Sequence, residues 1–141
     1  QDIDFAVIFG YPEKARQIKP ALDFLYAADL PVFSTSRIYN GIYQDDLNRD
    51  LSNVYFTTMP WTMPKQLPRK LQSNYEMHVA YKQLYARGYD SFLLLRNLET
   101  LKLNTDYTVF GATGELSLVN MTIKRRVQWA HFRDGKVRSL P

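Results

Sequence analysis

The fold is decided by the stretch Ile3-Asp4-Phe5-Ala6-Val7-Ile8-Phe9-Gly10, a nearly continuous apolar run that a glycine closes. Such a run is typical of a parallel strand that is buried on both faces of its sheet. Pro12-Glu13 comes next, and a proline with an acid beside it indicates the first turn of a helix. Apolar residues then recur at helical spacing until Pro31-Val32-Phe33 begins a second strand. This strand–helix–strand unit should be parallel and right-handed, and Pro20 inside it should kink the helix or delay its start.

Further along the chain, the same signals predict alternating elements before the pattern changes to all-β. In chain order these are a polar loop at 34–41, a short helix at 45–51, a strand at 54–58, a proline-rich loop at 59–68, helices at 75–86 and 91–101 separated by Arg87-Gly88-Tyr89-Asp90, a turn at 111–114, a strand at 115–118, a longer strand with Ile123, Val127 and Trp129 on one side, the hairpin turn Asp134-Gly135 and a last strand at 137–140. We therefore expect an α/β fold with three layers, in which a mainly parallel sheet is flanked by helices and followed by a C-terminal β-hairpin.

The composition is that of a globular domain, with 45% hydrophobic and 23% charged residues in a chain of 141. Because the chain contains no cysteine, disulfides, thiolate metal sites, a cysteine nucleophile and a lipid-modified cysteine are excluded within it. No apolar run approaches the roughly 18 residues that a transmembrane helix needs. The first residues lack the basic and apolar regions of a signal peptide, so we expect neither kind of segment.

The net charge of +4 is concentrated near the C-terminus, where residues 120–141 hold six basic side chains against Asp134 alone. A basic end can indicate a nucleic-acid interface, but the solvated face of a hairpin is the more common explanation. Trp129 alternates with Ile123 and Val127, which predicts a place in the core and not on a stacking platform for bases. We therefore expect a solvated hairpin and no nucleic-acid partner.

Residues that could support catalysis are sparse. His78 and His131 lie far apart in the sequence, and neither belongs to a metal-binding spacing. The G-x-S-x-G motif of serine hydrolases is absent, and Gly111-Ala112-Thr113-Gly114 is too short for a phosphate-binding loop. We expect a protein without catalytic residues, metal or cofactor.

A candidate ligand crevice lies at the carboxyl end of the second strand, where Ser34-Thr35-Ser36-Arg37 combines hydroxyl groups with a guanidinium. Ligands of open α/β sheets meet such loops, and these groups suit a carboxylate or a phosphate. The alternative is that a serine of this loop caps a turn while its arginine pairs with Asp45 or Asp46, and the sequence leaves both possibilities open. The crevice candidates, which also come from the end of the first strand and from the rest of the loop, are Gly10, Tyr11, Ser34, Thr35, Ser36, Arg37 and Tyr39.

The order of elements is similar to the C-terminal half of a type I periplasmic-binding-protein fold. The motifs that carry this resemblance are VYFTT at 54–58, Gly88-Tyr89-Asp90, Gly111-Ala112-Thr113-Gly114 and the run at 127–137. The resemblance implies that residues 1–141 are the C-terminal portion of a two-lobed domain. It divides them into the strand–helix units of one lobe at 1–60, a crossing segment and a helix pair at 61–103, and a return β-hairpin at 104–141.

Four further motifs resemble the LppC/LpoA family more specifically. They are IKP at 18–20, STSRIYNG at 34–41, LYARGYDS at 84–91 and GATGEL at 111–116. Members of that family are outer-membrane lipoproteins of Gram-negative bacteria that activate a class A penicillin-binding protein. The resemblance implies a non-enzymatic, partner-binding domain of a periplasmic protein, tethered to the outer membrane through a lipid-modified cysteine that this chain lacks.

Two functions of different classes therefore stand side by side. The first is contact with a peptidoglycan synthase of the class A penicillin-binding type, with Trp61, Arg125, Arg126 and Arg133 as contact candidates. Trp61 lies in the proline-rich loop, where an exposed tryptophan suits a contact and a buried one suits the core. The second is a lobe of a periplasmic solute-binding protein that takes a small amino-acid-like or anionic ligand in the crevice. In a chain that lacks the first lobe, the apolar faces of the helix pair would be exposed and could drive dimerisation or element swapping.

Overall fold

The computed structural model describes residues 3–26, 29–42, 44–63, 66 and 79–140. These residues form two compact units, one made of Gln1–Thr58 with Trp129–Pro141 and the other of Met59–Gln128. The segment 104–141, expected as one return hairpin, is therefore divided between the two units.

The first unit contains a five-stranded mixed sheet in the order β1-β2-β3-β7-β8. The strands β1 (Ala6–Ile8), β2 (Val32–Ser34) and β3 (Val54–Thr58) are parallel, so the predicted strand–helix–strand unit is confirmed. The strands β7 (Gln128–Arg133) and β8 (Lys136–Ser139) form an antiparallel hairpin at the end of the sheet. Asp134 and Gly135 both have positive φ in the two-residue turn between them, as the Asp-Gly dipeptide predicts.

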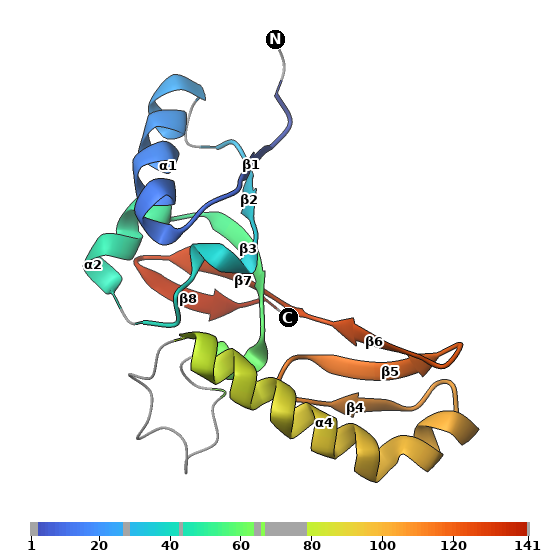
Figure 1. Cartoon of the computed structure of the whole chain (residues 1–141). Helices are drawn as coiled ribbons and strands as arrows, with labels where there is room; N and C mark the ends of the chain where they lie inside the picture. The colour runs from blue at the N-terminus through green and yellow to red at the C-terminus, as the bar shows by residue number, and fades with distance from the viewer. Residues whose placement is uncertain (1–2, 27–28, 43, 64–65, 67–78, 141) are drawn as a thin grey trace. The chain divides into compact units, whose positions relative to one another are not determined.

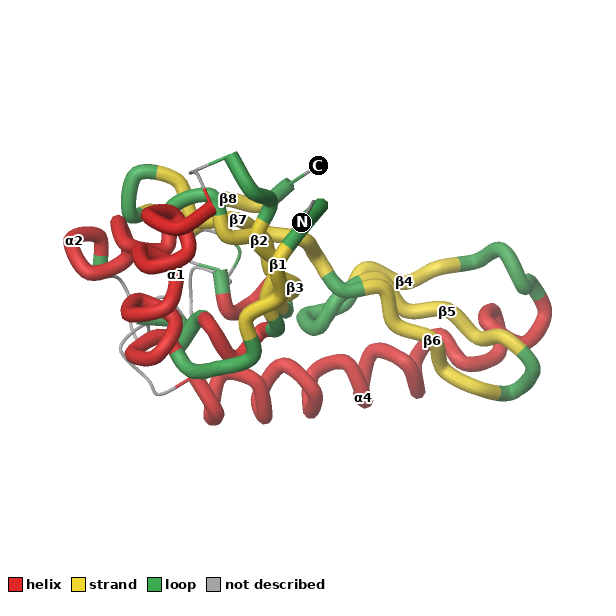
Figure 2. Tube along the Cα trace, turned by 90° about the horizontal axis from the view of Figure 1, so that it is seen from above, coloured by secondary structure: helices red, strands yellow, loops and turns green. Residues whose placement is uncertain are grey.

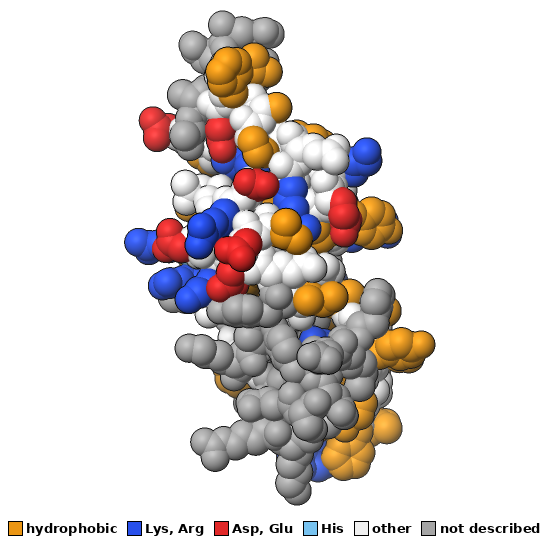
Figure 3. Space-filling view, turned by 90° about the vertical axis from the view of Figure 1, so that its left-hand side faces the viewer, with side chains coloured by type: hydrophobic (Ala, Val, Ile, Leu, Met, Phe, Trp, Pro, Cys, Tyr) orange, Lys and Arg blue, Asp and Glu red, His pale blue; other side chains and the backbone are white. Residues whose placement is uncertain are grey.

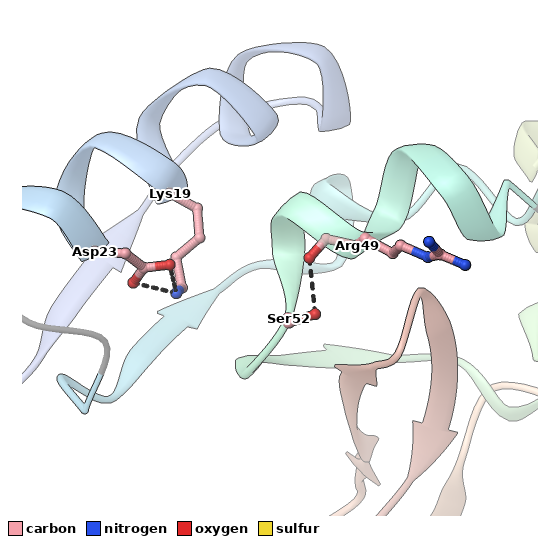
Figure 4. A network of polar contacts seen from close by, with 4 residues as sticks. All are labelled: Lys19, Asp23, Arg49 and Ser52. Carbon is pink, nitrogen blue, oxygen red and sulfur yellow. Dashed lines mark hydrogen bonds and ion pairs between the residues drawn. The ribbon is translucent and has the colours of Figure 1, made fainter.

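The helix α1 (Pro12–Tyr26) follows β1 and passes through Pro20 without a delayed start. Its Lys19 is almost fully buried, and the ammonium group donates to both carboxylate oxygens of Asp23, with 2.6 Å to Oδ2 (Figure 4). The same figure shows the end of the next helical segment, α2 (Asp45–Asn48) with η2 (Arg49–Leu51), where the Ser52 hydroxyl donates to the carbonyl of Arg49 at 2.7 Å. Each of these bonds stabilises one helical segment, and the helical segments lie beside the parallel strands (Figure 1).

The two faces of the first sheet differ in the described residues. One face carries the buried side chains Val32, Val54, Phe56, Ala130 and Phe132, which form the core. The other face carries a row of aromatic contacts, in which the Phe33 ring lies 5.8 Å from Tyr55, 6.1 Å from Phe5 and 6.2 Å from Trp129. Trp129 is 46% exposed, so its predicted place in the core is wrong. Trp129 lies on this second, open face and not on the face that carries the core.

The second unit packs the long helix α4 (Val79–Leu103) on an antiparallel sheet of β4 (Thr108–Phe110), β5 (Glu115–Val119) and β6 (Thr122–Arg126). Figures 1 and 2 both show α4 running alongside these strands. The core between them contains Leu93 and Leu101 from the helix and Val109, Leu116 and Leu118 from the sheet.

Two predictions fail in this unit. The helix pair at 75–86 and 91–101 is, from residue 79 onward, one continuous helix through Gly88. A glycine inside a helix costs only about 1 kcal/mol relative to alanine, and the burial of Ala86 and Leu93 on either side outweighs it. The single long strand through 123–129 is in fact two strands, β6 and β7, which belong to different sheets and are separated by Val127.

Candidate functional site

The first candidate site lies in the first unit, where β1 and β2 end. The guanidinium of Arg37 lies over the Tyr11 ring, 5.8 Å from its centroid, and both side chains are exposed. Such a pair is a weak cation–π contact that leaves the guanidinium donors open to solvent. Among the described residues Arg37 forms no ion pair, since Asp46 pairs with Arg49 at 3.7 Å instead. The predicted alternative, an ion pair of Arg37 with Asp45 or Asp46, is therefore absent from the described residues.

The remaining crevice candidates are used by the fold to different extents. Ser34 is buried, and its hydroxyl donates to the carbonyl of Ile8 at 2.7 Å, which fastens β2 to β1. Thr35 precedes the 3-10 turn η1 (Ser36–Ile38) without a side-chain capping bond. The structure therefore brings Tyr11 and Arg37 together as an exposed pair and commits Ser34 to the sheet.

Tyr39 is a core residue. Its ring lies 5.9 Å from Phe56 and 6.2 Å from Phe132, and its side chain is almost fully buried. Gly10, the last of the crevice candidates, lies half-buried at the end of β1. Because its side chain is packed in the core, Tyr39 is the crevice candidate least able to contact a ligand.

The second candidate site lies in the second unit and is built on a buried carboxylate. Asp90 of α4 is only 4% exposed, and its Oδ1 accepts from the Ala112 amide at 2.6 Å. Its Oδ2 accepts from the Thr113 amide at 2.9 Å and from the Thr113 hydroxyl at 2.5 Å. We call this arrangement of Asp90, Ala112 and Thr113 the Asp90 lock. It joins the middle of α4 to the loop between β4 and β5.

The glycines of this loop are required by close contacts. A Cβ on Gly111 would lie 2.5 Å from Oδ1 of Asp90. Gly114 has φ of +141°, and a Cβ there would lie 2.2 Å from the carbonyl oxygen of Arg126. The motifs Gly88-Tyr89-Asp90 and Gly111-Ala112-Thr113-Gly114, which are far apart in the sequence, therefore meet in one structural device. Sequence reasoning assigned the second motif to a turn and did not find its partner.

Trp61 lies beside the Asp90 lock on the turn η3 (Pro60–Thr62). Its backbone amide donates to the carbonyl of Ala112 at 3.2 Å. Its ring lies 4.7 Å from Tyr89 and stacks on Tyr85 at 6.1 Å. We call these three rings the Trp61 stack. Because Trp61 is half-buried while both tyrosines are exposed, the stack combines a fixed position with an accessible aromatic surface.

The predicted basic contact residues belong to different elements. Arg125 and Arg126 lie on β6, whereas Arg133 lies on β7 in the first unit. Arg126 pairs with Glu115 across the strands at 3.3 Å, and Arg133 lies 4.0 Å from Asp134. The three side chains therefore do not share one hairpin, as the sequence suggested. On the side of the first unit that carries α1 and α2, acidic and basic side chains are interspersed (Figure 3).

Among the residues that the structure describes, His131 and Lys82 have shifted pKa values. Burial, followed by the positive charges of Arg133 and Arg138, lowers the pKa of His131, whose ring stands edge-on to Tyr55 at 5.7 Å. Burial also lowers the pKa of Lys82. The described residues contain no group of three or more metal-ligating side chains, and His78 lies outside them. Within the same part of the chain, none of the helices has the length and apolarity needed to cross a membrane.

Comparison with known proteins gives these sites a family context. Residues 1–135 match the model of the family described as "LppC putative lipoprotein". A protein of Histophilus somni (strain 129Pt) named penicillin-binding protein activator LpoA is 23% identical over 143 residues, which covers 99% of this chain and 24% of that protein. The chain thus spans about a quarter of the length of such a relative.

Solved structures share the fold, and two of them show its range. The C-domain of LpoA (YraM) from Haemophilus influenzae, a regulator of PBP1A, matches with a TM-score of 0.80 at 22% identity, over 99% of this chain and 45% of that one. A putative branched-chain amino acid ABC transporter from Chromobacterium violaceum matches with a TM-score of 0.66 at 24% identity, over 92% and 42%. The predicted α/β fold and its likeness to periplasmic binding proteins are confirmed. Since the family model spans nearly the whole sequence, the chain belongs to the LppC lipoprotein family.

Proposed function

We propose that this chain is a non-enzymatic, partner-binding part of a longer lipoprotein that activates a class A penicillin-binding protein. The observation that carries the proposal is the match over 99% of the chain to a protein named as such an activator. The longer protein is periplasmic and held at the outer membrane by a lipid anchor. The chain supplies part of the surface that meets the synthase.

The accessible surface of the second unit supports a role in protein contact. The Trp61 stack exposes Tyr85 and Tyr89, and the same helix carries Phe92 and Leu95 with more than half of each side chain exposed. Aromatic side chains in fixed positions are the usual anchors of protein interfaces because they bury a large area at a small entropic cost. The Asp90 lock keeps α4 and the 111–114 loop in one arrangement, so these anchors are presented without further ordering.

The mechanism is a shift in the conformational equilibrium of the synthase. A saturating partner that binds the active state of an enzyme more tightly than the inactive state multiplies the ratio of active to inactive enzyme by the ratio of the two affinities. No bond is made or broken by the activator. The residues that matter are then those that contact the synthase, for which Trp61 and Arg125 are the first candidates.

The test is equilibrium binding of the purified chain to the periplasmic part of a class A penicillin-binding protein, together with a peptidoglycan cross-linking assay. Saturable binding is expected, and Trp61→Ala should weaken it at least fivefold, whereas Trp61→Phe, which keeps an aromatic ring, should weaken it less. Trp129→Ala is the matched control because it removes the other tryptophan, which lies in the other unit. Circular dichroism and light scattering establish that each variant is folded and whether the chain dimerises through its open apolar faces.

The outcomes separate three cases. Binding with increased cross-linking supports an activating surface within the chain. Binding without increased cross-linking makes the chain a docking part of the activator. A folded, monodisperse chain that does not bind removes the proposed contact from these 141 residues.

A second candidate function is a receptor lobe for a small amino-acid-like or anionic ligand. The observation that favours it is the exposed Arg37 over Tyr11 at the strand ends, together with the likeness in fold to an amino-acid transport protein. A ligand at a hundredfold excess over its Kd stabilises the folded state by about 2.7 kcal/mol. A thermal-shift panel of amino acids and cell-wall peptides should therefore reveal it, and Arg37→Ala should abolish the shift. A panel without any shift counts against this function.

A further inference from the structure

A small cavity with two basic walls lies in the second unit, between α4 and one edge of its sheet. Its volume is about 190 Å³. Arg87, Asp90 and Leu94 line it from the helix, Leu116 from β5, and Ile123 and Arg125 from β6. The strand register explains the last two, because Arg125 is paired with Leu116 and Ile123 with Leu118, whose side chains face the helix. Arg125 therefore occupies an inward-facing position on an edge strand.

The charges around this cavity are not balanced. Within the described part of the chain, the guanidinium groups of Arg87 and Arg125 take part in no ion pair or hydrogen bond, whereas the neighbouring Arg126 is paired with Glu115. Asp90 is the acidic residue in the lining, and both of its oxygens are already engaged by the amides of the Asp90 lock. Two guanidinium groups and one carboxylate leave a formal charge of +1, which favours an anion.

The shape and the apolar wall restrict what that anion can be. Leu94, Leu116 and Ile123 form an apolar surface between the two arginines, and such a surface suits a short methylene stem. The volume is below the roughly 300–1,000 Å³ of a site for a drug-sized molecule, so the cavity fits a group of side-chain size. A carboxylate on an aliphatic stem, as in glutamate, satisfies both the arginines and the wall.

We propose that the Arg87–Arg125 cavity receives a glutamate or aspartate side chain from an acidic segment of the partner protein. This inference rests on the proposed function and names the chemistry of one contact within it. The Asp90 lock holds the backbone of α4 to the 111–114 loop, so the helix that carries Arg87 keeps its position beside this loop before a partner binds. An inward-facing arginine on an edge strand can also discourage aggregation, but that role does not require Arg87.

The test is an NMR titration of the isotope-labelled chain with two probes. The first is the peptide acetyl-Gly-Glu-Glu-Leu-Glu-Gly-amide, with the peptide in which glutamine replaces each glutamate as its control. The second is glutarate, a free dicarboxylic acid of similar stem length. The acidic peptide should give saturable shifts at the amides of Ser91 and Ile123 and at the guanidinium signals of Arg87 and Arg125, and the glutamine peptide should not.

Charge-matched variants then assign the effect to the cavity. Arg87→Gln and Arg125→Gln should each weaken peptide binding at least fivefold. Lys124→Gln removes the same charge from the adjacent position of β6, whose side chain points to the other face, and should change binding less than twofold. Equal losses in all three variants would show general electrostatic attraction and overturn the proposal. If glutarate binds saturably and the acidic peptide does not, the proposed contact with a segment of the partner protein is wrong. If neither probe binds, the proposed carboxylate site is wrong.

Binding to the synthase separates this inference from the proposed function. If the peptide fails to bind while the synthase binds the wild-type chain and the Arg87→Gln/Arg125→Gln chain equally, the cavity inference falls and the proposed function stands. If the peptide binds as described while the synthase does not bind, the proposed function falls and the cavity remains a carboxylate site. If the synthase binds the wild-type chain and binds the double variant at least fivefold more weakly, the results support both the cavity inference and the proposed function.

Discussion

Replacing Asp90 tests the structural device on which the second unit depends. Its carboxylate accepts two backbone amides and one hydroxyl from residues that are themselves buried. A buried donor left without an acceptor costs about 1–3 kcal/mol. Asp90→Ala would orphan both amides and should lower the free energy of unfolding by about 3–5 kcal/mol. That is a large fraction of the roughly 5–15 kcal/mol that stabilises a typical domain.

Asp90→Asn gives the more informative measurement because the chain should remain folded. The amide oxygen of asparagine can still accept one backbone N–H, while its NH₂ group faces the second one. We therefore expect a loss of about 2 kcal/mol, seen as a lower midpoint in urea with an unchanged slope. The amides of Ala112 and Thr113 should exchange with solvent roughly 30-fold faster, because each 1.4 kcal/mol corresponds to about a factor of ten.

The matched control is Asp106→Asn, which makes the same chemical change in the same unit. Asp106 is exposed, and within the described residues its carboxylate forms neither a hydrogen bond nor an ion pair. It should shift the free energy of unfolding by less than about 0.5 kcal/mol. The reasoning is refuted if Asp90→Asn behaves like this control and exchange at residues 112 and 113 is unchanged.

Three further predictions follow from single contacts. Gly114→Ala should lower the free energy of unfolding by more than about 2 kcal/mol, because φ at Gly114 is +141° and the new Cβ would clash with the Arg126 carbonyl. Gly88→Ala should raise the free energy of unfolding by about 0.5–1 kcal/mol, because no atom lies within 4 Å of a Cβ there. Thermal unfolding that ranks the two variants in the opposite order contradicts the structure. Because the pKa of His131 is lower in the folded chain than in the unfolded one, the unfolded chain binds more protons, and stability should fall as the pH falls below about 6.5, toward the folded pKa. His131→Gln should reduce the difference between urea midpoints at pH 7.5 and pH 5.5, and an unchanged difference would show that another group is responsible. Asp23→Ala leaves the buried Lys19 ammonium without its carboxylate, whereas Lys19→Met removes the charge and keeps the volume. Asp23→Ala should therefore lower the free energy of unfolding by at least about 1 kcal/mol more than Lys19→Met does. The reverse order in chemical denaturation would argue against a buried ion pair.

Local patterns predicted most of the strands and turns. The continuous apolar run before Gly10 and the β-branched and aromatic residues at 54–58 both became parallel strands. The expected burial of the first run on both faces is wrong, because β1 lies at the edge of the sheet and Val7 is 45% exposed. The Asp134-Gly135 dipeptide predicted the hairpin turn because its two positive φ values are those that glycine and aspartate tolerate. In these places the conformation is set within a few residues, so the sequence is sufficient.

Long-range packing explains what the sequence did not predict. Gly88 looked like a helix break, but the core contacts of Ala86 and Leu93 carry α4 through it. The alternation from Ile123 to Trp129 suggested one strand with a buried face, but Ile123 belongs to β6 of the other sheet and Trp129 lies on the open face of the first sheet. Both errors concern information that lies in other segments of the chain.

One feature of the sequence does indicate the Asp90 lock. Asp90 falls on the same helical stripe as the buried residues Ala86, Leu93 and Leu101, and a carboxylate on a buried stripe needs donors from elsewhere. The glycine-rich loop at 111–114 was the available source of free amides. The ligand crevice stays a prediction, and the sequence could not show that tertiary contacts commit Ser34 to the sheet and Tyr39 to the core while Tyr11 and Arg37 stay exposed.

Competition for the synthase tests the central claim most directly, namely that this chain carries part of an activator's contact surface. A class A penicillin-binding protein is assayed for peptidoglycan cross-linking with its full-length lipoprotein activator at half-saturation, while the chain is added in increasing excess. We predict that the activation changes along a curve whose midpoint is proportional to the Kd of the chain for the synthase, and that Trp61→Ala moves this midpoint upward at least fivefold. Activation that stays constant up to a large excess of folded, monomeric chain would contradict the claim.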